Sequence, residues 1–219
     1  MPHLDFLNDD YEEKKTNAQK IEEDIKVKIL TKKYKTGQRI VEQDLCEIYG
    51  ISRTPIREIL RRIESEGLIQ TIPNRGAFVK GFSRRDIDDF FTLKSMLEIQ
   101  CVKWAVERIT DEELETLEEI FEFMQFYTMS NDLEKMIRIN KGFDTVIYAA
   151  CHNSTIEAAL HKYNFYLHHA TAKVKYPINY LDTVLEEHRA IYEAIKNRDR
   201  EAAEAASEVH MLKTMMRRK

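Results

Sequence analysis

Apolar residues recur at helical spacing over most of this 219-residue chain. Between residues 53 and 66, one apolar stripe lies apart from a ridge of arginines spaced four residues apart, which predicts a helix with one buried and one exposed face. Gly50 supplies a flexible corner before this helix, Pro55 fits its first turn and Gly67 is a suitable stop. The stripe comprises Ile56, Ile59, Leu60 and Ile63, and the ridge comprises Arg53, Arg57 and Arg61. The major groove of DNA admits a short helix of this kind.

The preceding segments predict the rest of a helix-turn-helix. Apolar positions predict one helix over residues 21–30 and a second over residues 41–49. Gly50-Ile51-Ser52 then forms a connection of the right length to the arginine helix, whose first N–H groups Ser52 or Thr54 can cap.

A β-hairpin is predicted directly after the arginine helix. Residues 68–72 and 77–80 are β-prone, and Pro73-Asn74-Arg75-Gly76 lies between them as a turn. The three predicted helices and the hairpin together indicate a winged helix-turn-helix, with Arg75 at the tip of the wing.

Charge also marks this part of the chain. Residues 26–80 hold 12 Lys and Arg against 6 Asp and Glu, a net charge of +6, whereas the whole chain carries −4. A basic segment in an acidic protein is where a polyanion would dock. A helical hairpin with a solvated charged face is the alternative, but the ordered turn, Pro, Gly stop and hairpin favour binding of double-stranded DNA.

The same segment resembles the DNA-binding domain of the GntR family of bacterial transcription regulators. The resemblance covers about residues 21–80, with a specific core at Ser52-Arg53-Thr54-Pro55-Ile56-Arg57-Glu58 and a wing at Asn74-Arg75-Gly76-Ala77-Phe78-Val79. It implies that Arg53 and Arg57 contact bases or adjacent phosphates. It also implies contacts of Thr54 with the DNA backbone and entry of Arg75-Gly76 into the minor groove. Gln43 departs from some members, which have a DNA-contacting arginine there. The predicted DNA-binding set is Ser52, Arg53, Thr54, Arg57, Arg75 and Gly76.

Composition changes near residue 81, where we place a domain boundary. Five of the six glycines lie within residues 37–81, and the sequence after them is nearly all helix-forming. We therefore expect a mainly α fold: a winged head over residues 1–81, with a polar arm at 1–15, and an all-α six-helix bundle over residues 82–219. Ser83 and the Thr110-Asp111-Glu112-Glu113 capping box open the first two helices of the bundle. Ser130 or Asn131 opens the third, Asn153 starts the fourth, and Pro177 separates the fourth from the last two.

Several features indicate a cytoplasmic protein. The acidic N-terminal residues are the opposite of a signal peptide, and no apolar run approaches the roughly 20 residues of a membrane span. Cys46, Cys101 and Cys151 are widely spaced and odd in number, which indicates reduced, mostly buried thiols.

Two histidines near the middles of the last two predicted helices are the main chemical feature of the bundle. His188 and His210 each lie about ten residues from the turn at 197–200, so antiparallel helices place them at similar heights. Asn140 and Asp144, four residues apart, project from one face of the third helix. Such nitrogen and oxygen donors fit Zn²⁺, Ni²⁺, Mn²⁺ or Fe²⁺. Core histidines bonded to their neighbours are the alternative.

The bundle resembles the FCD ligand-binding domain of the same family. The matching motifs are Leu93-Lys94-Ser95-Met96-Leu97-Glu98, Phe143-Asp144-x-x-Ile147-x-x-Ala150-x-x-Asn153, and Glu187-His188-Arg189-Ala190-Ile191 followed by His210. The resemblance implies a metal site at Asn140, Asp144, His188 and His210. Asn140 takes the place of an aspartate and Asp144 that of a histidine, which should favour harder ions. The alternative is a metal-free pocket in which His188 and His210 bind the effector or each other. The resemblance also implies effector contacts from Lys94 and Asn153. Lys94 stands for a family arginine and alternatively pairs with Glu98.

We therefore expect a homodimeric transcription regulator that binds a pseudo-palindromic operator and is controlled by a small metabolite, an organic acid by the resemblance. We expect no enzymatic activity. The alternatives are a metal-dependent bundle enzyme that uses Asp144, His188 and His210, and an architectural DNA-binding protein with no effector.

Overall fold

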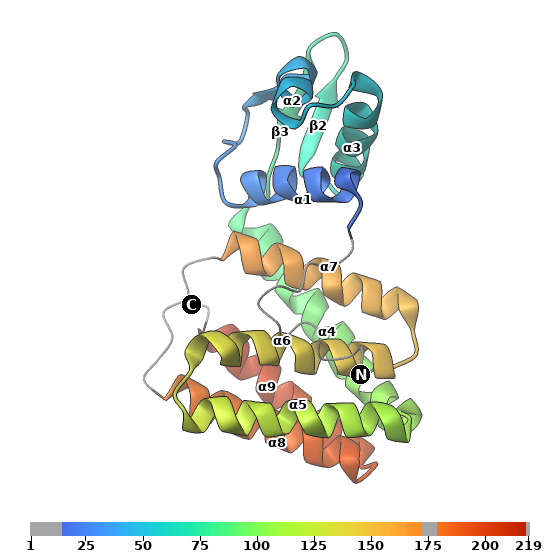
Figure 1. Cartoon of the computed structure of the whole chain (residues 1–219), viewed down its shortest axis with the longest axis vertical. Coiled ribbons are helices and arrows are strands. Elements are labelled where there is room, and N and C mark those ends of the chain that lie inside the picture. Colours follow the sequence, from blue (N-terminus) through green and yellow to red (C-terminus); the bar gives the residue numbers. More distant parts are fainter. Residues whose placement is uncertain (1–14, 172–178, 218–219) are drawn as a thin grey trace. The chain divides into compact units, whose positions relative to one another are not determined.

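The computed structural model describes residues 15–171 and 179–217 (Figure 1). These residues form two compact units: residues 15–89 with 166–171, and residues 90–165 with 179–217. The fold is mainly α-helical with one small antiparallel sheet, which confirms the predicted fold class. Apart from Lys15, the predicted polar arm lies outside the described residues, and so does Pro177.

The first unit contains the predicted helix-turn-helix. Its helices are α1 (Asn17–Leu30), α2 (Glu42–Tyr49) and α3 (Arg53–Ser65). Helix α1 begins four residues before the predicted start, because Thr16 and Gln19 form a capping box there. The apolar stripe of α3 is buried as predicted and packs against α1 and α2, so the opposite face of α3 remains exposed.

The turn between α2 and α3 depends on a glycine. Gly50 ends α2 with φ +65, in the left-handed region, and its N–H donates to the Cys46 carbonyl. A side chain at this position would strain the backbone. The turn therefore determines where the first residues of α3 are presented.

The predicted hairpin is present, and a third strand joins it. Strands β2 (Ile69–Ile72) and β3 (Gly76–Val79) pair antiparallel, with Ile72 opposite Gly76. Strand β1 (Arg39–Ile40) pairs with the other edge of β3 and gives the order β1-β3-β2. Strand β1 was not predicted from the sequence. Two residues are too few to show a periodicity, and the pairing forms only once the chain has folded.

After residue 83, the described chain consists of helices in the order predicted for the bundle (Figure 1). Ser83 caps the first of them through its Oγ, which accepts from the Asp86 N–H at 3.2 Å, and Thr110 and Glu113 form the predicted capping box. Asp132, and not Ser130 or Asn131, caps the third helix through a bond from the Lys135 N–H. The helices are α4 (Arg84–Arg108), α5 (Asp111–Met129), α6 (Leu133–Ala150), α7 (Ser154–Ala170), α8 (Tyr180–Lys196) and α9 (Arg200–Arg217).

Packing of these helices forms a continuous apolar core. Helix α5 packs against α6 and α8, and α8 packs against α9. Two ion pairs join α4 to α9, Lys103 to Glu204 at 2.6 Å and Arg200 to Glu107 at 2.7 Å. Because residue numbers rise along α4 as they fall along α9, these two helices run antiparallel. This packing places residues from α4, α6, α8 and α9 around one point in the core.

Two further predictions concern the whole described chain. None of its helices is long and apolar enough to cross a membrane. Cys46, Cys101 and Cys151 are free thiols, and the last two are buried.

Candidate functional site

Arg53 and Arg57, two of the arginines predicted to contact DNA, are exposed at the start of α3. Each makes a hydrogen bond with a side chain of α2. The Arg53 guanidinium donates to the Gln43 side-chain oxygen at 2.8 Å, and Arg57 Nε donates to Glu42 at 2.8 Å. Exposed pairs of this kind contribute little to stability, so they exchange readily for a phosphate or a base edge. The residue that departs from the family, Gln43, therefore orients Arg53.

The start of α3 also offers unbonded donors. Ser52 occupies the N-cap position of α3, but its side chain makes no capping hydrogen bond. The prediction that Ser52 caps this helix through its side chain is therefore wrong. The Ser52 and Thr54 side chains are both exposed. Free N–H groups at a helix N-terminus attract anions such as phosphate.

The wing tip is shaped for an exposed arginine. Arg75 N–H donates to the Ile72 carbonyl at 3.0 Å, which closes the turn. Asn74 and Gly76 both have positive φ, 61 and 92. Arg75 is exposed, and its guanidinium carbon lies 6.0 Å from the centre of the Phe78 ring. The predicted DNA-contacting residues are therefore grouped at the start of α3 and at the wing tip.

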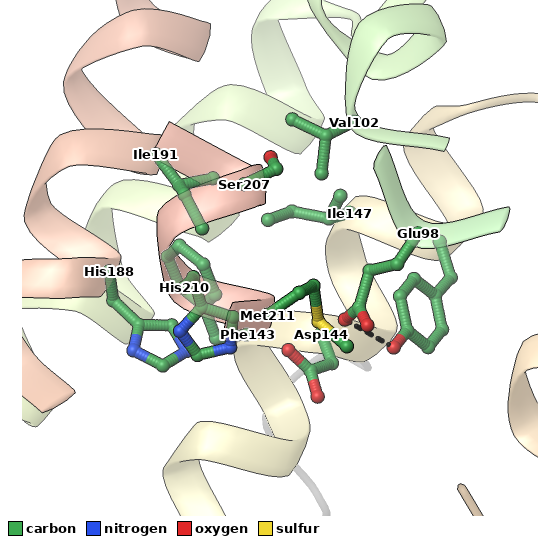
Figure 2. A pocket seen from close by; sticks show the side chains of 11 residues that line it. Glu98, Val102, Phe143, Asp144, Ile147, His188, Ile191, Ser207, His210 and Met211 are labelled. Carbon is green, nitrogen blue, oxygen red and sulfur yellow. Dashed lines mark hydrogen bonds between the residues drawn. The ribbon is translucent and has the colours of Figure 1, made fainter. Parts of the chain in front are cut away.

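A cavity in the helical unit brings together three of the predicted metal ligands (Figure 2). Its volume is about 10 Å³, which is room for about one water molecule. Helices α4, α6, α8 and α9 supply the walls. The lining residues are Glu98, Val102, Phe143, Asp144, Ile147, Tyr148, His188, Ile191, Ser207, His210 and Met211.

His188 and His210 lie side by side in this wall, as their positions relative to the turn predict. Their ring centres are 4.7 Å apart. His188 Nδ1 faces the Val184 carbonyl at 2.8 Å, and His210 Nδ1 faces the Glu187 carboxylate at 2.9 Å. An oxygen acceptor requires a proton on Nδ1, so Nε2 carries the lone pair of His188 when this ring is neutral. Burial, assisted by the charge of His210, lowers the pKa of His188 to about 3, and this ring is neutral at pH 7.

Glu187, the neighbour of His188 in sequence, orients the His210 ring through its carboxylate. Arg217 donates one hydrogen bond of 2.7 Å to each oxygen of the Glu187 carboxylate. Burial acts to raise the pKa of Glu187, but the bonds from Arg217 and His210 outweigh it and lower the pKa to about 2. This network was not predicted from the sequence, because Glu187 lies 23 residues from His210 and 30 residues from Arg217.

A second buried carboxylate, Glu98, is fully bonded. Lys94 donates to one oxygen and the Tyr148 hydroxyl donates to the other at 2.8 Å. Burial acts to raise the pKa of Glu98, but the charge of Lys94 and these bonds outweigh it, and the pKa is lowered. The alternative predicted for Lys94, an ion pair with Glu98, is thus present, buried instead of exposed. Lys94 is absent from the described lining of the cavity.

Asp144 differs from Glu98, because no described residue makes a hydrogen bond with its carboxylate. Burial and the nearby charge of Glu98 raise the pKa of Asp144 to about 7. In Figure 2, this carboxylate appears between the imidazole pair and Glu98. Asp144 is therefore the acceptor in the wall that is available to a ligand.

The other two predicted site residues are not in the described lining. Asn140 lies one turn before Asp144, and its buried Oδ1 has no hydrogen-bond partner. Asn153 is an N-terminal capping residue for α7, since its Oδ1 accepts from the Ile156 N–H at 3.0 Å. An effector contact from either Asn153 or Lys94 stays a prediction.

The predicted metal ligands have suitable donor atoms, but their positions in the structure do not form a metal site. Each of the four predicted ligands, Asn140, Asp144, His188 and His210, has an acceptor atom to offer. However, no three His, Cys, Asp or Glu side chains of the described residues gather closely enough to hold a metal ion. In this arrangement the residues do not form a metal site, and the metal site stays a prediction.

The fold and the exposed arginines define a class of protein: a winged helix-turn-helix head joined to a helical unit whose mostly apolar cavity contains two histidines and two carboxylates. The family model for bacterial regulatory proteins of the gntR family matches residues 17–79, and the model for the FCD domain matches residues 89–213. The chain therefore belongs to the GntR family, and its helical part is an FCD domain.

Curated relatives are named as transcription regulators. The uncharacterized HTH-type transcriptional regulator YdhC of Bacillus subtilis is 29% identical over 181 residues, which cover 82% of this chain and 80% of that protein. The HTH-type transcriptional regulator McbR of Escherichia coli is 31% identical over 128 residues, 58% of each chain. A solved structure of E. coli McbR/YncC shares the fold, with a TM-score of 0.68 at 24% identity, over 92% of this chain and 96% of that one. The protein is thus a DNA-binding transcription regulator.

Proposed function

We propose that the protein acts as a homodimer that binds a pseudo-palindromic operator, one half-site per head, under control of a small molecule in the FCD cavity. The single observation that carries the DNA-binding mode is the pair of exposed arginines, Arg53 and Arg57, at the start of α3. Two heads held together gain effective concentration on a site with two halves.

Each group of DNA-contacting residues has a distinct role. Arg53 and Arg57 enter the major groove and contact base edges or adjacent phosphates, while Ser52 and Thr54 contact the backbone. Arg75 and Gly76 at the wing tip enter the minor groove. There, groove width and contacts with the DNA backbone contribute more to binding than base identity does. Glu42 and Gln43 hold the two arginines in place until the DNA replaces them.

An exposed apolar surface on α4 and α9 supports the dimer. Val209, Leu212 and Met216 follow helical spacing on α9 and are 49%, 50% and 62% exposed. Leu93 and Met96 on α4 are 44% and 64% exposed. The ion pairs between α4 and α9 bring these two sets to the same level of the bundle. Contiguous exposed apolar side chains mark association surfaces, and a second copy of the chain is the proposed partner.

Control by a ligand follows from the position of the cavity. Its walls come from α4, α6, α8 and α9, so a ligand would contact the same two helices that carry the dimer surface. A ligand that favours one arrangement of the dimer changes the affinity of the protein for its operator. Operator binding then changes the affinity for the ligand by the same factor. The names of the relatives support a regulator over an enzyme, and a turnover screen that detected a reaction would favour the enzyme.

The experiment begins with selection of operators from a random duplex library by the full-length protein. Arg53→Ala and Arg57→Ala should each weaken specific binding by about 1–3 kcal/mol if each arginine contacts a base. Arg138→Ala, which removes one positive charge from the helical unit, is the matched control and should leave affinity unchanged. Unchanged affinity and selectivity in both head variants would rule out the docking mode.

A further inference from the structure

An arginine outside the predicted DNA-binding set lies on the wing, in the strand that was not predicted from the sequence. Arg39 is exposed in β1, and its partner on β3 is Phe78. Successive side chains of a strand point to opposite faces, so Arg39 and Phe78 share one face while Ile40 and Ala77 share the buried one. Arg39 is therefore on the outer face of the wing.

The Arg39 guanidinium extends along this face to the tip of the wing. Its Nε lies 3.4 Å, and one terminal nitrogen 3.6 Å, from the position that a Cβ would take at Gly76. Because Gly76 has no side chain, this side of the tip is open to Arg39. Arg75, the next residue, has its guanidinium carbon 6.0 Å from the centre of the Phe78 ring. The tip of the wing thus carries two guanidinium groups, one from β1 and one from the turn.

Neither guanidinium group is neutralised within the part of the chain that the structure describes. Residues 15–171 and 179–217 make no hydrogen bond or ion pair with the side chain of Arg39 or Arg75. The three strands and the turn between β2 and β3 contain no Asp or Glu. Arg53 and Arg57 differ, since side chains of α2 bind both. Two unpaired guanidinium groups at one tip repel each other, and an anion bound there would remove this repulsion.

A DNA phosphate is the anion that fits this position. A guanidinium group can donate two parallel N–H bonds to phosphate oxygens. Arg75 projects from the turn, whereas Arg39 lies on the sheet beside it. When the tip is in the minor groove, Arg39 therefore faces the backbone that borders the groove. We propose that Arg39 is a further DNA-contacting residue, which binds a backbone phosphate at the edge of the minor groove that the wing tip enters. The inference rests on the proposed docking of the winged head on DNA.

The size of the effect follows from the release of counterions. Each phosphate neutralised on double-stranded DNA changes the slope of log affinity against log salt concentration by about 0.9. One such contact contributes roughly 8-fold to affinity in about 0.1 M salt and roughly 2-fold in about 0.4 M salt. Two heads on one operator double the change in slope to about 1.8, and the contributions become roughly 60-fold and roughly 5-fold.

The test uses full-length protein with a duplex selected from a random library and with a scrambled duplex, across this range of KCl concentration. Arg39→Ala should weaken binding to both duplexes by similar factors and reduce the salt slope by about 1.8, because a phosphate contact carries no sequence information. Arg39→Lys keeps the charge and should retain the slope, with a smaller loss of affinity because an ammonium cannot bind in two places at once. Arg62→Ala is the matched control. It removes an exposed arginine that pairs with Glu22 in the last turn of α3, and it should leave the slope unchanged.

Neutral methylphosphonate groups, substituted one at a time along the selected duplex, locate the phosphate. At one position that borders the minor groove in each half-site, the substitution should weaken binding by wild type but not by Arg39→Ala. An Arg39→Ala variant with the wild-type salt slope would overturn the inference, and so would one that responds to every substitution as wild type does.

Arg53→Ala, measured in parallel, separates this inference from the proposed function. If Arg53→Ala weakens specific binding while Arg39→Ala has no effect, the Arg39 contact is wrong and the proposed DNA-binding mode stands. A wild-type protein that selects no duplex from the library would contradict the proposed function, and the inference with it.

Discussion

The buried ion pair between Lys94 and Glu98 leads to the most quantitative prediction. The two residues are 6% and 5% exposed, and within residues 15–171 and 179–217 the one other hydrogen bond to Glu98 comes from the Tyr148 hydroxyl. Glu98→Gln keeps the shape of the side chain but removes its charge. The Lys94 ammonium would then be buried with no carboxylate bonded to it.

The size of the effect follows from this burial. Removal of one partner of a buried pair destabilises a protein by about 3–5 kcal/mol, because the remaining charge is uncompensated. Lys94→Met should have a similar effect, since Glu98 would retain only Tyr148. The double variant Lys94→Met/Glu98→Gln buries no charge, so it should be less destabilised than the sum of the single variants by roughly 2 kcal/mol or more.

Urea unfolding followed by tryptophan fluorescence measures this effect in the helical unit alone. The chain has one tryptophan, Trp104, which lies in α4 and packs against the core of that unit. Glu134→Gln is the control, because the Glu134–Arg138 pair has the same i,i+4 spacing with side chains 80% and 38% exposed. It should change stability by no more than about 0.5 kcal/mol.

Two results would refute the reasoning about the pair. One is a Glu98→Gln variant as stable as Glu134→Gln, which would mean that water or another anion reaches Lys94. The other is a double variant destabilised by the full sum of the single variants, which would mean that the two residues act independently.

Three further predictions concern other parts of the molecule. Because the pKa of Glu187 is lowered to about 2, its stabilisation is present above its usual value near 4.5 and lost as the pH falls toward 2. The difference in urea stability between wild type and Glu187→Gln should therefore shrink over that range from roughly 3 kcal/mol, and a pH-independent difference would contradict the assignment. Leu212→Glu should convert the dimer to a monomer in sedimentation, whereas the equally apolar but separate Met129→Glu should not; a dimeric Leu212→Glu would place the interface elsewhere. Arg75→Ala should weaken binding to selected and scrambled duplexes by similar factors, and a loss confined to the selected sequence would show base contact.

Local signals made the fold predictable. The left-handed Gly50, the turn residues Asn74 and Gly76 and the capping box at Thr110 each act on neighbouring residues, so the sequence alone showed where elements begin and end. Strand β1 and the Asp132 cap were missed for different reasons. The pairing of β1 depends on a strand 37 residues later in the chain, as Ile40 lies opposite Ala77. Ser130, Asn131 and Asp132 are all suitable caps, and propensity does not choose among adjacent candidates.

The site was predictable to a smaller extent. Counting residues from the turn between α8 and α9 placed His188 beside His210, because both helices are regular and antiparallel. What those residues contact depends on side chains from other helices, and no spacing rule relates Glu187 to Arg217 or Glu98 to Tyr148.

The sign of charge in the cavity illustrates why motif matching was insufficient. Lys94 and Arg217 are cations near the cavity, and a simple count would balance them against the carboxylates of its wall, Glu98 and Asp144. Each is bound by a buried carboxylate, so the carboxylate of the wall that remains for a ligand is Asp144, to which no described residue makes a hydrogen bond. At residue 144 a carboxylate takes the place of the family imidazole, so an oxygen acceptor and not a nitrogen contributes to the cavity wall at this position.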